Sequence, residues 1–149
     1  SWAGAIGQVQ FMPSSFLAYA VDFDRDGRKN LWGSLDDVFG SAANYLAKSG
    51  WKGDETWGRR VVLPPDFDPT LINYKKTRRL IKYWQDAGVR RPNAADLPNV
   101  DLLASLVRPS KKEDDTFLIY QNYRTILKWN RSHYFALAVG HLADAIIQR

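Results

Sequence analysis

The sequence is poor in the side chains that most often carry catalysis, with no cysteine, two glutamates and two histidines among 149 residues. Without cysteine it can form neither disulfides nor thiolate metal sites, which fits a cytoplasmic or a bacterial periplasmic protein equally well. No window approaches the roughly 18 apolar residues of a membrane span, and no basic segment precedes an apolar one as in a secretory signal. The 45% of hydrophobic residues suffices for one ordinary core.

The formal net charge of +5 raises the question of a polyanionic partner. Basic residues occur in pairs at 59–60, 75–76, 78–79, 90–91 and 111–112. No nucleic-acid-binding motif accompanies them, so a solvated basic face is the favoured interpretation and no nucleic acid is expected as a partner. The six tryptophans and seven tyrosines are more informative, because flat rings with polar tips stack on sugars as well as in cores.

Helical periodicity dominates the N-terminal part of the chain. The stretch at 12–20 predicts a short helix with a proline in its first turn. A longer helix is expected to begin after Ser34, an N-cap residue with Asp37 three positions on, and to end at Gly50.

The segment 51–116 has a different texture, since prolines interrupt short apolar runs. RRVVL at 59–63 predicts a strand, and 77–88 predicts a helix closed by a glycine. Two apolar runs within 102–120, separated by a charged loop led by a proline, predict a β-hairpin. The segment is therefore expected to form a smaller lobe.

Two helices are expected at the C-terminal end, over 123–129 and then from a cap at Asn130 or Ser132 to about Ile147. Because the last helix is apolar on most sides, it is expected to be buried in the core. The predicted fold class is α+β, mainly α, organised as a helical core at 1–58, an inserted small α/β lobe at 59–120 and C-terminal helices at 121–149 that return to the core.

Residues 22–27 read DFDRDG, the pattern of the first half of an EF-hand loop. In such loops alternate carboxylates and a backbone carbonyl ligate Ca²⁺. The usual glutamate at position twelve is replaced by Gly33, so a longer loop over 22–36 must supply the last carboxylate. An acidic turn that only caps helices is the alternative, but three like charges this close repel unless a cation lies among them. A structural Ca²⁺ is therefore expected, with the ligands Asp22, Asp24, Asp26, the carbonyl of Arg28, and Asp36.

Four segments, GAIGQVQFMPSSF, DFDRDGRKNLW, AANYL and KWNRSHYFALAV, resemble the lytic murein transglycosylase B family in the same order along the chain. The resemblance implies a lysozyme-like helical domain with an inserted lobe and an EF-hand-like metal loop. It also implies action on peptidoglycan glycan strands in the bacterial periplasm. Any attachment to the outer membrane would come from a lipid anchor outside this chain.

The resemblance assigns Ser1 and Gln10 to the floor of a substrate groove, Tyr45 to its wall, and Trp129 and Asn130 to the opposite side. These residue types suit a neutral polysaccharide, which needs amide and hydroxyl partners and stacking surfaces. Each residue taken alone could equally be a satisfied amide, a cap or a core aromatic, and only the joint pattern favours binding.

Phe135 stands where one family member has tyrosine, and this change removes a hydroxyl. The neighbouring Tyr134 is expected to replace it in substrate binding. His133 and His141 are expected to be packed or surface imidazoles, since no triad or metal-ligand spacing accompanies them.

Glycosidic cleavage needs a carboxylic acid that stays protonated near neutral pH. Glu55 and Glu113 both lie in polar, charge-rich segments, so neither is expected to be that acid and no catalytic residue is assigned. In the family the acid is a glutamate upstream of the segment that matches Ser1, and it acts first as acid and then as base. The C6 hydroxyl of the sugar closes onto C1 to give a 1,6-anhydro product.

The chain is therefore expected to be the C-terminal part of the catalytic region of an enzyme that cleaves the MurNAc–GlcNAc β-1,4 bond, and to be inactive alone. A non-catalytic peptidoglycan-binding module is the first alternative. A calcium-braced module that binds protein or nucleic acid is the second, and it would bind polyanions in a strongly salt-dependent way.

Overall fold

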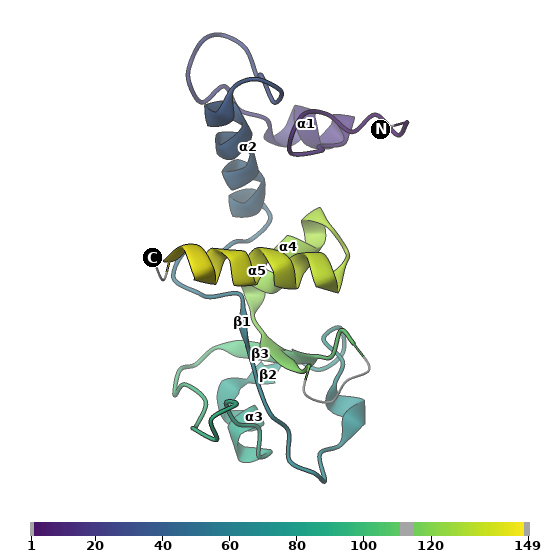
Figure 1. The fold of residues 1–149 in the computed structure, drawn as a ribbon, viewed down its shortest axis with the longest axis vertical. Helices are drawn as coiled ribbons and strands as arrows, with labels where there is room; N and C mark the ends of the chain where they lie inside the picture. The colour runs from purple at the N-terminus through teal and green to yellow at the C-terminus, as the bar shows by residue number, and fades with distance from the viewer. Residues whose placement is uncertain (1, 111–114, 148–149) are drawn as a thin grey trace. The chain divides into compact units, whose positions relative to one another are not determined.

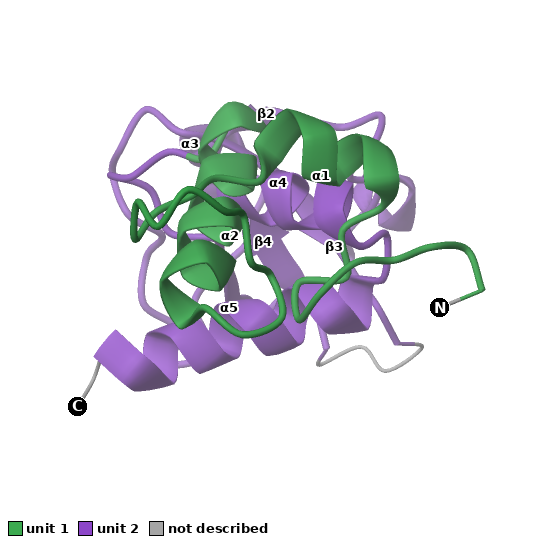
Figure 2. Cartoon of the chain, turned by 90° about the horizontal axis from the view of Figure 1, so that it is seen from above, with its two compact units in different colours: residues 1–51 green, residues 52–149 purple. Residues whose placement is uncertain are grey.

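A computed structural model describes residues 2–110 and 115–147. The chain divides into two compact units, Ser1–Trp51 and Lys52–Arg149, coloured green and purple in Figure 2. No helix in the described part of the chain is long and apolar enough to cross a membrane. Each unit is described by itself below.

The first unit contains helices α1 (Pro13–Tyr19) and α2 (Leu35–Lys48), joined by a long loop over residues 20–34 (Figure 1). We call it the acidic loop after its three alternate aspartates, Asp22, Asp24 and Asp26. Ser34 caps α2, because its hydroxyl accepts a hydrogen bond from the backbone N–H of Asp37 at 3.3 Å. Past the last turn, Gly50 adopts a φ of 101° and lets the chain turn back. Both predicted helices and the cap are confirmed.

The second unit is built on a four-stranded antiparallel sheet with the strand order β1-β4-β3-β2. The predicted hairpin is confirmed, since Leu106 of β3 pairs with Leu118 of β4. The predicted strand at 59–63 is confirmed only in part, because Val62 leaves the sheet and pairs with Arg90 instead. The strands are β1 (Gly58–Arg60), β2 (Arg79–Leu80), β3 (Leu103–Val107) and β4 (Phe117–Ile119).

Alternation along β4 puts apolar side chains on both faces of the sheet. Phe117 and Ile119 pack into a core with Trp57 and the helices α4 (Gln121–Trp129) and α5 (His133–Ile147). Leu118 packs on the opposite face, in a second core that includes Trp84 of the short helix α3 (Ile81–Asp86). Figure 1 shows α3 and the α4–α5 pair on different sides of the sheet. A 3₁₀ turn, Pro69–Leu71, lies in the loop before β2.

Two predictions for the second unit are wrong in extent. The helix predicted at 77–88 is only six residues long, because Arg79 and Leu80 pair with β3 and Leu80 has an extended ψ of 151°. The last helix forms as predicted but is not buried. Only Ala136, Leu137 and Gly140 are buried in α5, since one face alone meets α4 and Trp57.

The boundary between the compact units falls after Trp51, and the C-terminal helices pack on the sheet within the second unit. The three-part division into 1–58, 59–120 and 121–149, with a return of the last part to the first, stays a prediction.

Candidate functional site

The acidic loop of the first unit gathers three carboxylates that could hold one metal ion. One oxygen each from Asp22, Asp24 and Asp37 lie within 4.8 Å of one another. Ligands of a Ca²⁺ ion lie 2.3–2.6 Å from the metal, so oxygens at this spacing fit around a single ion. In the part of the chain that the structure describes, no other such group of acidic or histidine side chains occurs.

Hydrogen bonds to the loop backbone fix these carboxylates in place. Asp22 accepts from the N–H groups of Asp26 and Gly27, at 3.1 and 2.9 Å. Asp24 accepts from the hydroxyl of Ser34 at 2.6 Å. The aspartates are therefore oriented by the loop itself, and the EF-hand-like calcium loop that the DxDxDG spacing suggests stays a prediction.

Asp37 is the third member of the group and a fully buried side chain. Its two oxygens accept from the backbone N–H of Phe23 at 2.6 Å and of Asn30 at 2.7 Å. The Asn30 hydrogen bond lowers the pKa of Asp37; burial opposes this, and the Phe23 hydrogen bond adds to it. Asp37 thus ties both ends of the acidic loop to α2.

The sequence prediction used Asp37 only as part of the helix cap and placed Asp36 in the ligand set. Asp36 lies one position earlier on α2 and is exposed, and it does not belong to the group of three. Asp26 also lies outside it, and its carboxylate accepts from the N–H of Arg28 at 2.8 Å. The membership of Asp26, Arg28 and Asp36 in a metal site stays a prediction.

Gln10 lies in a tight turn closed by hydrogen bonds between Ile6 and Phe11. Its backbone φ is 53°, in the left-handed region that residues other than glycine rarely adopt. Its side-chain NH₂ group donates to the carbonyl of Gly7 at 2.8 Å, and the side-chain oxygen takes no part in this bond. The turn therefore holds an exposed amide in a fixed orientation.

Tyr45 of α2 belongs to the same unit and to an aromatic cluster next to this turn. Its ring meets Tyr19 edge-on at 4.8 Å and Phe11, the neighbour of Gln10, at 5.7 Å. Burial raises the pKa of the Tyr45 phenol, so it stays protonated at neutral pH. Phe11, which follows Gln10 in the chain and packs on the ring of Tyr45, thus links two of the predicted site residues of the first unit.

The predicted site residues of the second unit lie where α4 ends and α5 begins. Trp129 is the last residue of α4, and Asn130 is its C-cap. The Asn130 side-chain oxygen accepts from the N–H of Ser132 at 2.9 Å, which leaves its NH₂ group for another partner. Tyr134 is 64% exposed, and its hydroxyl donates to the carbonyl of Pro109 at 3.3 Å.

Ser1 and Glu113 lie outside the described residues. Gln10 and Tyr45 belong to one compact unit and Trp129, Asn130 and Tyr134 to the other, so their sharing of one groove stays a prediction.

Glu55 is less exposed to solvent than its polar sequence neighbours suggest. The residue is half-buried, and its Oε2 atom is buried without a hydrogen-bond partner among the described residues. The backbone explains this position, because the carbonyl of Glu55 accepts from the side chain of the buried Asn122 at 2.7 Å. Charged neighbours in the sequence do not reveal such a long-range contact.

Comparison with known proteins gives consistent matches over almost the whole chain. Residues 1–144 match the family model described as "Transglycosylase SLT domain". The membrane-bound lytic murein transglycosylase B of Escherichia coli K12 is 39% identical over 98% of this chain. The chain spans 39% of the length of that relative.

Solved structures show the same similarity. SltB3 from Pseudomonas aeruginosa, in complex with NAG-anhNAM-pentapeptide, matches with a TM-score of 0.92 at 46% identity over 97% of this chain and 39% of its own. The Escherichia coli lytic transglycosylase SLT35, in complex with calcium, matches with a TM-score of 0.76 at 34% identity over 99% of this chain and 46% of its own.

Proposed function

Because the chain belongs to the transglycosylase SLT domain family, we propose that it is part of a peptidoglycan lytic transglycosylase of the bacterial periplasm. It has the lysozyme-like lytic transglycosylase fold, with several helices and a small antiparallel sheet. The observation that carries the proposal is the match to SltB3, a protein captured with a NAG-anhNAM-pentapeptide.

The proposed substrate is the glycan strand, cleaved at the MurNAc–GlcNAc β-1,4 bond with formation of 1,6-anhydroMurNAc. Gln10, Tyr45, Trp129, Asn130 and Tyr134 supply amides, hydroxyls and flat rings, and Ser1 is proposed to join them. None of these residues is of an acidic or basic type, which suits a neutral sugar backbone. Two of them, Gln10 and Asn130, are held by their own local hydrogen bonds, so little side-chain freedom is lost on binding.

The general acid is proposed to be a glutamate on a segment upstream of Ser1, as in the family. Cleavage then needs no second carboxylate, because the C6 hydroxyl of the sugar attacks its own C1. An internal nucleophile has a high effective concentration, so no water has to be activated.

The experiment measures 1,6-anhydro products released from purified peptidoglycan, resolved by mass. Three proteins are compared: the 149-residue chain, a chain extended upstream to include the family glutamate, and the extended chain with that glutamate changed to glutamine. Loss of general acid catalysis costs about 10²- to 10⁴-fold, so only the extended chain is expected to be active. Anhydro products from the short chain would overturn the placement of the acid, and Glu55→Gln would then be the next variant.

The alternative is a peptidoglycan-binding module without catalysis. The residue types of the candidate site favour this alternative as much as they favour an enzyme. All of them are suited to binding a sugar, and none is a carboxylic acid that could catalyse its cleavage. Sedimentation with insoluble peptidoglycan but no product from the extended chain would establish this alternative.

Calcium is proposed as a structural ion in the acidic loop, since Asp22, Asp24 and Asp37 have the spacing that one ion requires and a relative was solved in complex with calcium. Asp26, the carbonyl of Arg28, and Asp36 are proposed to complete the ligand set. The ion would brace the loop against α2 and take no part in the chemistry. No nucleic acid is proposed as a partner.

A further inference from the structure

A hollow of about 640 Å³ in the second unit is lined by positive charge. Four of its lining residues are cationic, and they come from two distant stretches of the chain. In the described part of the chain no aspartate or glutamate lines it. We call it the basic hollow; its polar and aromatic lining is Tyr74, Lys75, Arg124, Lys128, Arg131 and His133.

Tyr74 holds two of these cations in place. The guanidinium of Arg124 lies 5.6 Å from the centre of the Tyr74 ring, and the ammonium of Lys75 lies 5.8 Å from it. Arg124 also donates to the carbonyl of Tyr74 and, at 2.6 Å, to the hydroxyl of Ser105. The charges are therefore ordered before any ligand arrives.

Three of the four cations have no ion-pair partner among the described residues. Among the described residues, no carboxylate lies within 4.0 Å of the charged groups of Lys75, Arg124 or Arg131. Burial, and then the charge of Arg78, lower the pKa of Arg124. A cluster of positive charges favours the binding of an anion.

Two other hollows of the same unit are linked to the basic hollow through shared lining residues. Tyr74 and His133 also line a smaller hollow of about 160 Å³, together with Arg108. Arg108 and Ile72 in turn line a third of about 520 Å³, whose other walls are apolar. Those walls are Val62, Leu63, Pro64, Pro65, Phe67 and Pro69. A ligand that filled the series would be anionic at one end and apolar at the other.

We propose that this series of hollows binds the peptide part of peptidoglycan, with peptide carboxylates in the basic hollow and small apolar side chains in the proline-lined one. The inference rests on the proposed function, because it assigns a binding place to the peptide of peptidoglycan, which the neutral sugar-binding residues do not account for. A sugar backbone gives these cations nothing to pair with, whereas a carboxylate pairs with arginine in a charge-assisted geometry. An extended pentapeptide spans at most roughly 17 Å, a length suited to adjoining hollows rather than to one.

The test uses the 149-residue chain and a synthetic peptidoglycan pentapeptide with free carboxylates, titrated by isothermal calorimetry. The same peptide with every carboxylate amidated is the ligand control. Binding of the free acid is expected to weaken steeply from about 0.01 M to about 1 M salt, and the amidated peptide is expected to bind at least about tenfold more weakly.

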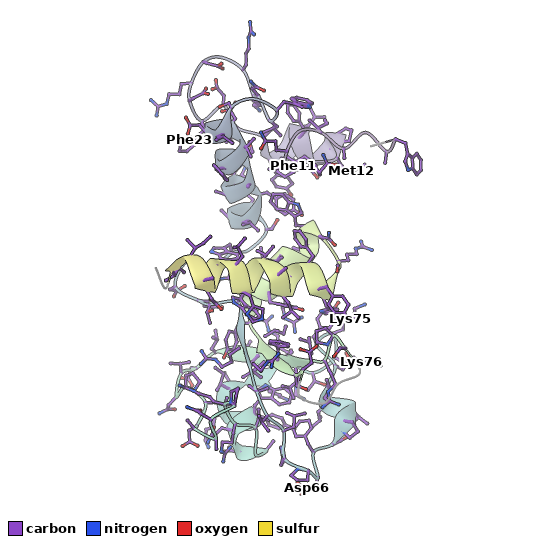
Figure 3. All side chains as sticks on the ribbon, viewed as in Figure 1. Phe11, Met12, Phe23, Asp66, Lys75 and Lys76 are labelled. Atoms are coloured by element: carbon purple, nitrogen blue, oxygen red, sulfur yellow. The ribbon has the colours of Figure 1, made fainter. Side chains whose placement is uncertain are left out.

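Two variants carry the test to the residues. Lys75→Gln/Arg131→Gln removes two cations of the basic hollow and is expected to weaken binding about tenfold, since an exposed charge pair contributes up to about fivefold. Lys76→Gln/Lys82→Gln removes the same charge from residues that do not line the hollow. Figure 3 labels Lys75 and its sequence neighbour Lys76. The control is expected to bind like the parent chain.

Equal binding of the free and amidated peptides, equal loss in both variants, or tighter binding of an oligonucleotide than of the peptide would each overturn the inference. Peptide-free glycan strands separate it from the proposed function. Processing of these strands by the extended chain without any binding of the pentapeptide would leave the enzyme in place and remove only the peptide site. Binding of the pentapeptide without any processing of glycan would remove the enzyme alone.

Discussion

The hydroxyl of Tyr123 in α4 and the Nδ1 atom of His133, the first residue of α5, lie 2.9 Å apart. Tyr123 is fully buried, and its ring stacks on the imidazole at 5.8 Å, while Tyr74 meets the imidazole edge-on at 4.9 Å. Burial, and then the charge of Lys75, lower the pKa of His133. The fold therefore favours the neutral form of the His133 imidazole, beside the buried hydroxyl of Tyr123 at the junction of the two helices.

This pair predicts that the chain loses stability in mild acid. In the unfolded chain His133 takes up a proton near pH 6.5, but in the folded chain it does so only at lower pH. The stabilisation is complete above about pH 6.5 and falls as the pH drops toward the folded pKa. The melting temperature is expected to fall between about pH 7 and pH 5, and less so in His133→Gln. His141→Gln is the control, and an identical pH slope in both variants would contradict the prediction.

The lowered pKa of Asp37 predicts a second loss of folding stability, at a more acidic pH than that of His133. Its pKa is lowered by the N–H of Asn30, so its contribution is present above the unfolded pKa of 3.8 and is lost as the pH falls through the lower folded value. Asp37→Asn is expected to lower the melting temperature at neutral pH in the presence of a chelator, because it removes the charge that two backbone donors require. Asp36, the exposed neighbour of Asp37, provides the control. Asp36→Asn with a chelator is expected to melt like the parent chain.

Calcium is predicted to increase the unfolding free energy of the chain by about 2.7 kcal/mol at a hundredfold excess over Kd. The melting temperature is expected to rise accordingly. Asp24→Ala is expected to abolish this response, since Asp24 belongs to the group of three carboxylates. Asp36→Asn distinguishes the ligand sets, because it weakens the response only if Asp36 ligates the ion. Equal melting temperatures with saturating calcium and with chelator would remove the metal site altogether.

Gly140 of α5 is predicted to be required by Trp57. A Cβ at this position would lie 2.5 Å from the Trp57 indole, whose Nε1–H also donates to Asp144 of the same helix at 3.0 Å. Gly140→Ala is therefore expected to destabilise the chain by about 1–3 kcal/mol, although alanine is the better helix former by about 1 kcal/mol. Denaturant unfolding measures the effect, with Ala138→Gly at an exposed position of α5 as the control. Stabilisation by Gly140→Ala would refute this packing.

The parts of the fold that the sequence predicted correctly depend on residues a few positions apart. Ser34 and Asp37 form the cap of α2, and the apolar runs around the charged loop form the β3–β4 hairpin. The alternate aspartates of the acidic loop are oriented by N–H groups of the same loop. Caps, turns and alternation act locally, so their pattern can be read from the chain.

Tertiary structure alone decided the rest. Part of the first turn predicted for α3 is a strand instead, because Arg79 and Leu80 pair with β3. Helix α5 is largely exposed, because only one of its faces contacts α4 and Trp57. Lys75 and Arg131 line one hollow although no local pattern connects them. Which distant side chains share a surface depends on how the sheet and helices pack, and packing is a property of the folded chain rather than of any short segment of it.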